Sequence, residues 1–135
     1  MAAEIQGMTP LLQVFDMQTS LKFYCEILGF SVLQTDTNTT TPKDWVWMKW
    51  NDTDLMLNTA YEADERPPAP DPSRIAAHND TRLYFGAPDV DAMYADLRAK
   101  GVALQAPTTA PYGMKQLFLQ DPDGFGLCFQ WKARS

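Results

Sequence analysis

Two stretches of the chain repeat one pattern of residues, and this internal duplication restricts the fold more than any other feature. Residues 11–32 contain a short apolar stretch, an aspartate, a helix-like periodicity and a glycine, and residues 83–104 contain the same features in the same order. An aspartate is suited to cap the start of a helix, and a glycine is suited to end it. The cap and stop pairs are Asp16 with Gly29 and Asp89 with Gly101. The duplication predicts two similar half-domains.

The segments around these helices extend the repeat. Apolar residues at i, i+3, i+4 and i+7 predict helices over residues 17–28 and 91–100. The stripes are Leu21, Tyr24, Cys25 and Leu28 in the first helix and Val90, Met93, Tyr94 and Leu97 in the second. The predicted strands cover residues 9–15, 30–34, 45–50 and 55–58, and then 81–86, 102–105, 114–120 and 126–130. The order is β-α-β-β-β, twice, which is a mixed α+β fold.

A proline-rich segment separates the two halves. We assign module one to residues 8–60, the linker to residues 61–80 and module two to residues 81–132. The linker contains Pro67, Pro68, Pro70 and Pro72. Prolines at this density disfavour helix and central strand, so the linker is expected to be extended and mobile. It can serve as a lid over a cleft or as a contact with a second subunit.

Charge and composition exclude several classes of function. The net charge is −6, which argues against a nucleic-acid partner. No apolar run is long enough to cross a membrane, and residues 1–10 lack the features of a secretion signal, so a cytoplasmic location is the expectation. Cys25 and Cys128 lack metal-binding spacing and are expected to be ordinary buried thiols.

The remaining titratable residues do not form a known catalytic pattern. Asp121 and Asp123 belong to a hairpin turn in which Gly124 supplies a positive φ angle. Asp16 and Asp89 are expected to be helix caps. The chain has one histidine, which lies in the proline-rich linker, so no Ser-His-Asp or Cys-His arrangement can be assembled around a fixed base.

Three segments carry a resemblance to a known family. They are DMQTSLKFYCEILGF over residues 16–30, DVDAMYADLRAKGV over residues 89–102, and YGMKQLFLQDPDG over residues 112–124. In this order, the segments resemble the vicinal oxygen chelate superfamily, which includes glyoxalase I, bleomycin-resistance proteins and extradiol dioxygenases. The resemblance implies two tandem βαβββ modules whose curved sheets surround a shared cavity.

The resemblance also assigns four metal-ligand positions, and here the chain departs from the family. Metal-using members place His, Glu or Gln at these positions, whereas this chain has Thr9, Met56, Arg82 and Cys128. An arginine stays protonated and cannot ligate, and a thioether is a soft ligand that does not suit a catalytic divalent ion. We therefore expect no metal and no cofactor, and we expect metal-dependent glyoxalase or dioxygenase chemistry to be absent.

Strand alternation and the resemblance together give a candidate site on the strand faces that look into the expected cavity. The candidate ligand-binding residues are Gln13, Trp45, Trp47, Met56, Arg82, Tyr84, Tyr112, Met114 and Cys128. Aromatic and thioether groups would form walls for a flat ligand, and the arginine would bind an anionic group. The alternatives are that the apolar residues fill a packed interior and that Arg82 is solvated or paired with Asp80.

These observations favour a metal-free protein that binds or sequesters a small organic molecule, in a homodimer as the resemblance implies. One alternative is a lyase or isomerase that works without a metal through Arg82 and the tyrosines. Another is an interaction domain without a ligand. The acidic net charge favours a cationic ligand and Arg82 favours an anionic one, so the sequence leaves the charge of the ligand open.

Overall fold

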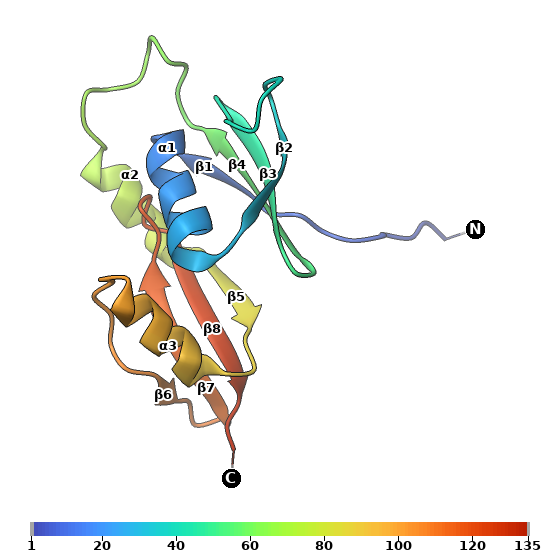
Figure 1. The fold of residues 1–135 in the computed structure, drawn as a ribbon, viewed down its shortest axis with the longest axis vertical. Helices are drawn as coiled ribbons and strands as arrows, with labels where there is room; N and C mark the ends of the chain where they lie inside the picture. Colours follow the sequence, from blue (N-terminus) through green and yellow to red (C-terminus); the bar gives the residue numbers. More distant parts are fainter. Residues whose placement is uncertain (1, 135) are drawn as a thin grey trace. The chain divides into compact units, whose positions relative to one another are not determined.

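The computed structural model describes residues 2–134, and the chain divides into two compact units, Met1–Arg66 and Pro67–Ser135 (Figure 1). We call them unit 1 and unit 2. Each unit contains one four-stranded sheet. No helix within residues 2–134 combines the length and the apolar character that a membrane crossing requires.

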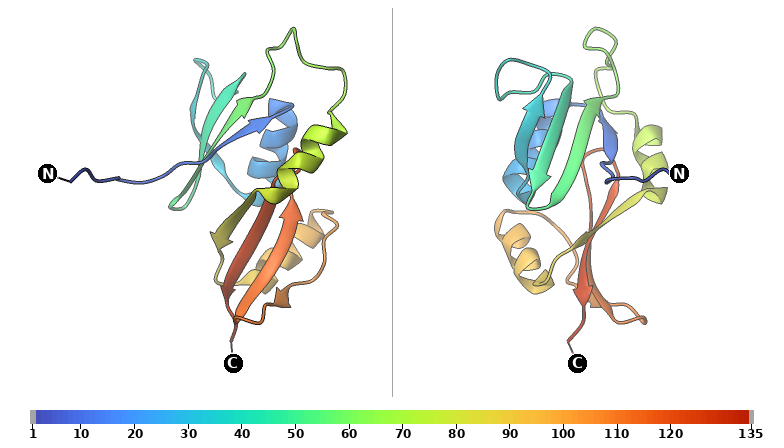
Figure 2. Two further views of the ribbon diagram at one scale, coloured as in Figure 1. Left: turned by 180° about the vertical axis from the view of Figure 1, so that it is seen from behind. Right: turned by 90° about the vertical axis from the view of Figure 1, so that its right-hand side faces the viewer.

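Unit 1 has the predicted order of elements. It contains β1 (Leu11–Val14), α1 (Met17–Leu21), η1 (Lys22–Leu28), β2 (Ser31–Thr35), β3 (Trp45–Trp50) and β4 (Thr53–Thr59). The strand order in the sheet is β1-β4-β3-β2, and β2, β3 and β4 lie side by side in Figure 2. β1 pairs with β4 in parallel, and the other neighbours are antiparallel.

Unit 2 repeats this arrangement. It contains α2 (Pro72–Ala77), η2 (His78–Asp80), β5 (Arg82–Gly86), α3 (Val90–Ala99), β6 (Thr108–Thr109), β7 (Met114–Gln120) and β8 (Gly126–Lys132). Its strand order is β5-β8-β7-β6, and the first strand again pairs in parallel with the last. The prediction of two tandem βαβββ modules is therefore confirmed.

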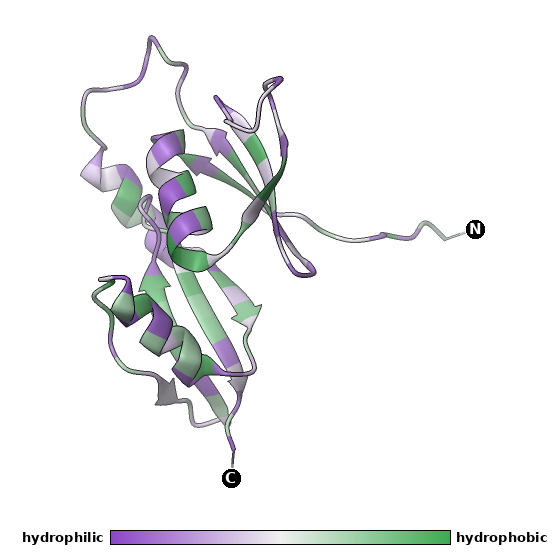
Figure 3. Cartoon of the chain, viewed as in Figure 1, coloured by the Kyte–Doolittle hydropathy of each residue, from purple (hydrophilic) through white to green (hydrophobic). Residues whose placement is uncertain are grey.

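Each core lies between one face of a sheet and its helix. In unit 1 the fully buried apolar residues include Val14, Tyr24, Val46, Met48, Leu55 and Leu57. In unit 2 they include Leu97, Leu117, Leu127 and Phe129. Apolar and polar residues lie on different sides of α1 and α3, as the predicted stripes require (Figure 3). Removal of these side chains from water is the main favourable term in the stability of each unit.

The first helix ends at Gly29 for a reason that the sequence did not indicate. Beyond α1 the helix widens into the π-helical segment η1, and the N–H groups of Gly29 and Phe30 both donate to the carbonyl of Tyr24 at 3.0 and 2.9 Å. Gly29 has φ = 154°, which lies outside the left-handed helical conformation that often ends a helix. A Cβ atom at this position would lie 3.1 Å from the Trp50 ring. Close approach of an aromatic ring favours glycine here.

The expectation that residues 61–80 are extended throughout is wrong, because α2 and η2 occupy residues 72–80. Asp71 caps α2 through a hydrogen bond from the Ser73 N–H to its side chain at 2.9 Å. Pro72 follows at the first helical position, where its missing N–H costs no hydrogen bond. Proline disfavours the interior of a helix but is compatible with its first position.

α2 is held against the turn between β7 and β8, so the histidine in the linker is fixed as well. Arg74 Nη1 lies 2.8 Å from Asp123 Oδ1, and the two side chains are 16% and 2% exposed. His78 Nδ1 lies 2.7 Å from the carbonyl oxygen of Asp123, and its ring stacks on Phe125 with a centroid distance of 3.9 Å. The expectation of a mobile His78 is wrong because these two contacts anchor it.

The turn that receives α2 has the predicted chemistry. Asp121 Oδ1 accepts hydrogen bonds from the N–H groups of Asp123 and Phe125, both at 2.9 Å. Gly124 has φ = 88°, as the turn requires. Asp121 and Asp123 are therefore turn residues, as predicted.

The strand predicted over residues 102–105 is absent. The N–H of Val102 bonds to the carbonyl of Leu97 at 3.0 Å and continues the end of α3. The edge of β7 pairs instead with β6, in which Thr108 is opposite Gln116 and Thr109 is opposite Lys115. Residues 102–105 thus have no strand partner, although their composition is suited to a strand.

Candidate functional site

The sheet of unit 1 has one face that does not belong to the core, which we call open face A. Its strand positions include Leu11, Gln13, Trp45, Trp47, Lys49, Asp54, Met56 and Asn58. The register places Met56 between Leu11 and Trp47, and Asn58 between Gln13 and Trp45. The predicted alternation of β3 is confirmed, because Val46 and Met48 are fully buried on the opposite face.

Polar contacts fix one edge of open face A. Trp47 Nε1 donates to Asp54 Oδ2 at 3.2 Å, and Lys49 Nζ lies 2.9 Å from Asp54 Oδ1. The pKa of Asp54 is lowered, chiefly by the hydrogen bond from Lys49. Because the indole N–H is bonded within the sheet, Trp47 presents mainly a ring surface to a ligand. Such a surface stacks on flat aromatic groups.

The sheet of unit 2 has a corresponding face, which we call open face B. Its strand positions include Arg82, Tyr84, Met114, Gln116, Phe118, Cys128, Gln130 and Lys132. The register places Cys128 between Tyr84 and Phe118. The two rings are 51% and 39% exposed, whereas Cys128 is fully buried. On this face the buried Cys128 thiol therefore lies between two exposed aromatic rings.

Arg82 lies over this face. Its guanidinium carbon is 5.1 Å from the centre of the Phe118 ring. Gly126 leaves room for the side chain, because a Cβ atom at Gly126 would lie 3.2 Å from Arg82 Nε. Burial raises the pKa of the Cys128 thiol, and the positive charge of Arg82 only partly opposes this effect. Cys128 is thus a protonated floor residue and is not suited to act as a nucleophile.

Side-chain amides connect the far end of open face B to Tyr112. Gln116 Nε2 donates to Gln130 Oε1 and to the hydroxyl oxygen of Tyr112, both at 2.9 Å. Gln116 is 5% exposed, so its orientation is set by these bonds. Gln116 and Phe118 are not among the nine ligand-binding residues predicted from the sequence. Both share a strand face with the selected Met114, so the same alternation rule identifies them.

The nine predicted ligand-binding residues fall into two groups. Gln13, Trp45, Trp47 and Met56 lie on open face A, and Arg82, Tyr84, Met114 and Cys128 lie on open face B. Tyr112 precedes β7 and joins the second group through Gln116. Their role in binding and the shared cavity stay predictions.

The residues at the four family metal positions do not fit a catalytic divalent ion. Thr9 precedes β1, and Met56, Arg82 and Cys128 lie on the two open faces. A hydroxyl, a thioether, a guanidinium and a protonated thiol do not supply the imidazole and carboxylate ligands that such an ion prefers. Among residues 2–134, no three His, Cys, Asp or Glu side chains gather as a possible metal group.

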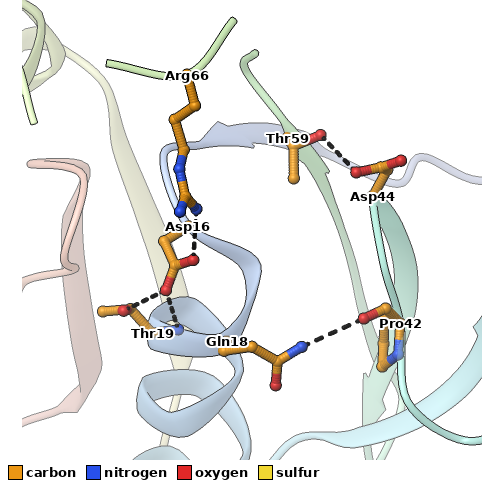
Figure 4. A network of polar contacts seen from close by, with 7 residues as sticks. All are labelled: Asp16, Gln18, Thr19, Pro42, Asp44, Thr59 and Arg66. Atoms are coloured by element: carbon orange, nitrogen blue, oxygen red, sulfur yellow. Dashed lines mark hydrogen bonds and ion pairs between the residues drawn. The ribbon is translucent and has the colours of Figure 1, made fainter. Parts of the chain in front are cut away.

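A separate depression of about 500 Å³ lies beside the start of α1 in unit 1. Its lining includes Asp16, Gln18, Pro42, Asp44, Thr59 and Arg66 (Figure 4). Arg66 Nη1 is 2.7 Å from Asp16 Oδ1, and the guanidinium carbon is 5.3 Å from the centre of the Phe15 ring. The helix cap therefore also holds the chain segment that follows β4.

Replacement of Asp16 tests this double role. The pKa of Asp16 is lowered, chiefly by the hydrogen bond from the Thr19 hydroxyl and further by Arg66. We expect Asp16→Ala to lose about 1 kcal/mol of unfolding free energy at pH 7, as for other helix caps. A group with a lowered folded pKa stabilises above its unfolded pKa, and this stability disappears as the pH falls through the folded value.

Urea unfolding at pH 7 and at pH 3 measures both effects. The difference in unfolding free energy between the wild type and Asp16→Ala should be about 1 kcal/mol at pH 7 and smaller at pH 3. Asp16→Asn is the control, because asparagine also caps helices and should lose less. A constant difference at both pH values would contradict a contribution from the ionised carboxylate.

Comparisons with known proteins agree with this geometry. The model of the Glyoxalase/Bleomycin resistance protein/Dioxygenase superfamily matches residues 7–129. YaeR of Escherichia coli is 35% identical over 116 residues, which are 83% of this chain and 84% of YaeR. The structure of TnmS3, an antibiotic binding protein from Streptomyces sp. CB03234, is 26% identical, with a TM-score of 0.66 and 98% of each chain covered. A bleomycin-binding protein complexed with bleomycin has the same fold at 20% identity, with a TM-score of 0.68, and covers 97% of this chain and 100% of its own.

Proposed function

The chain belongs to the Glyoxalase/Bleomycin resistance protein/Dioxygenase superfamily, and from this premise we propose that it binds a small organic molecule without a metal ion. The proposed binding surfaces are open faces A and B. The residues that contact the ligand are the nine predicted ones together with Gln116 and Phe118. Their mixture of apolar walls and a few polar groups is typical of small-molecule sites.

The observation that carries this proposal is the exposure of large apolar side chains on the open faces. Leu11 is 43% exposed, Tyr84 51% and Phe118 39%. Half-buried Met56 is paired with Leu11 on open face A, and half-buried Trp45 and Trp47 lie on the same face. Grouped apolar exposure of this kind marks surfaces that bind a ligand or another protein surface. A homodimer is part of the proposal, and light scattering at micromolar concentration tests it.

Two relatives support a ligand-binding role. TnmS3 binds an antibiotic, and the bleomycin-binding protein binds bleomycin. The binding of a drug-like molecule requires affinity and no chemistry, which is compatible with the loss of metal ligands at Thr9, Met56, Arg82 and Cys128.

Melting-temperature measurements on EDTA-treated protein test the proposal. We expect Ni²⁺, Zn²⁺ and Fe²⁺ to leave the melting temperature unchanged, because the donor set does not suit them. At least one compound of a panel of aromatic and drug-like molecules should raise it. Stabilisation follows RT ln(1 + [L]/Kd), which is about 2.7 kcal/mol when the ligand concentration is a hundred times Kd.

Tryptophan fluorescence locates the bound compound. A compound that stacks on open face A should quench the emission, and Trp47→Phe should reduce the quenching. Trp50→Phe is the control, since Trp50 packs on Phe30 at a ring distance of 5.4 Å and is not part of the open face. Stabilisation by one equivalent of a metal ion would contradict the metal-free proposal.

A lyase or isomerase that works without a metal is the second candidate. The observation in its favour is that Arg82 and Tyr84 are both exposed on the same face of β5, where an anionic intermediate would meet a cation and a hydroxyl group. A substrate screen that detects turnover, with loss of that turnover in Arg82→Ala, would establish this function in place of simple binding.

A further inference from the structure

Open face B has a charge that differs in sign from that of the whole chain. The net charge of the chain is −6. The strand positions of open face B nevertheless carry two cationic side chains, Arg82 and Lys132, and no acidic one. On open face A the charges of Lys49 and Asp54 cancel in an ion pair at 2.9 Å. Open face B is therefore a local positive surface on an acidic protein.

Among the residues that the structure describes, no acidic side chain forms an ion pair with Arg82. Acidic residues form ion pairs with Lys49, Arg66, Arg74, Lys100 and Lys115. Arg82 has no such partner among residues 2–134, and Asp80 does not pair with it. Its guanidinium rests on the Phe118 ring, which leaves its N–H donors available for a planar acceptor.

The groups around Arg82 are suited to a flat apolar body. Tyr84 and Phe118 flank the buried Cys128, and both rings are exposed. Gly126 lies between Arg82 and Gln120 in the sheet, and because it has no side chain, the surface is recessed at this position. An aromatic acid would place its ring against these side chains and its anionic group against the guanidinium.

We propose that open face B selects an organic anion with a flat apolar body, such as an aromatic carboxylate, and that Arg82 binds its anionic group. This inference rests on the proposed function and names the class of its ligand. It answers the question that the sequence leaves open, because the local charge of the face outweighs the net charge of the chain at contact distance.

Three probes with the same ring and different charge test the inference. They are naphthoate, naphthamide and a naphthyl trimethylammonium salt, titrated calorimetrically into the full-length protein. We expect naphthoate to bind at least about tenfold more tightly than naphthamide, because a charge-assisted hydrogen bond contributes a free energy of that size. Added salt should weaken the binding of naphthoate and leave naphthamide unchanged.

Two arginine variants separate a specific contact from general charge. Arg82→Gln should reduce the affinity for naphthoate to that for naphthamide. Arg98→Gln is the matched control, because the Arg98 guanidinium also lies over a ring, that of Tyr94 at 5.6 Å, but on α3. It should bind naphthoate as the wild type does. Arg82→Lys, which keeps the charge and loses the planar fork, should lie between the two.

The outcomes distinguish this inference from the proposed function. Tighter binding of the ammonium salt, or full affinity for naphthoate in Arg82→Gln, would overturn the anion assignment and leave small-molecule binding intact. If none of the three probes binds but a compound of the broader panel does, the anion assignment is likewise overturned and small-molecule binding stands. Failure of every compound in both panels would overturn both proposals.

Discussion

Gly124→Ala is expected to lower the unfolding free energy of unit 2 by about 2–5 kcal/mol, because two penalties coincide at this position. Gly124 has φ = 88°, where a side chain strains the backbone. A Cβ atom would also clash with the carbonyl oxygen of Ile75 and would lie 2.8 Å from Ile75 Cγ2. Because the first contact is with backbone, α2 must move away from the turn. Urea unfolding followed by circular dichroism measures the loss.

Gly101→Ala is the matched control for this prediction. Gly101 has φ = 85°, and a Cβ atom there would meet nothing within 4 Å. Its replacement therefore carries the backbone penalty alone, about 1–2 kcal/mol. Equal losses in the two variants would mean that the packing of α2 on the turn contributes nothing.

Arg74→Met is expected to cost about 3 kcal/mol, because it leaves the Asp123 carboxylate without its ion-pair partner in a buried place. The Asp123 side chain is 2% exposed, and its Oδ1 atom is 2.8 Å from Arg74 Nη1. Methionine is close to arginine in length and apolar, so the loss reports the charge more than the packing. The measurement is again the unfolding free energy in urea.

Two further variants check the origin of that loss. Adding Asp123→Asn to Arg74→Met removes the buried charge that has lost its ion pair with Arg74, so the double variant should lose less unfolding free energy than the sum of the single losses. Arg66→Met breaks the ion pair with Asp16, whose side chains are 44% and 32% exposed, and should cost less than about 1 kcal/mol. Additive losses at Arg74 and Asp123 would contradict direct coupling.

The sequence predicts those parts of the fold that local patterns determine. The bounds of β3 and β7 are as predicted, since large aliphatic, aromatic and thioether residues recur on both faces of these strands. Asp16 and Asp89 cap their helices through side-chain hydrogen bonds from Thr19 and Ala92 N–H groups. Capping and alternation act over a few residues, so they can be read without tertiary information.

The sequence does not reveal the features that depend on distant partners. α2 is fixed by Asp123, which is 49 residues away from Arg74 in the chain. The strand expected over residues 102–105 is absent because β6 occupies the edge of β7. In both places the local composition is ambiguous, and the position of a partner decides between the conformations.

The candidate site shows the same division. Alternation placed Arg82 and Tyr84 on one face, and the structure agrees. The sequence does not show which charged side chains form ion pairs. A pair such as Lys49 with Asp54 depends on the register between two strands. For the same reason, the sequence does not show that Arg82 has no ion-pair partner among residues 2–134.

The docking of α2 changes the mechanical length of the connection between the units. Arg66 is tied to Asp16 on one side, and Asp71 begins α2 on the other. Only residues 67–70 lie between these anchors, and three of the four are proline. Five peptide units span at most about 18 Å, against roughly 70 Å for a free connection of twenty residues. The docking of α2 therefore leaves only a short, proline-rich stretch between the ion pair at Arg66 and the cap of α2.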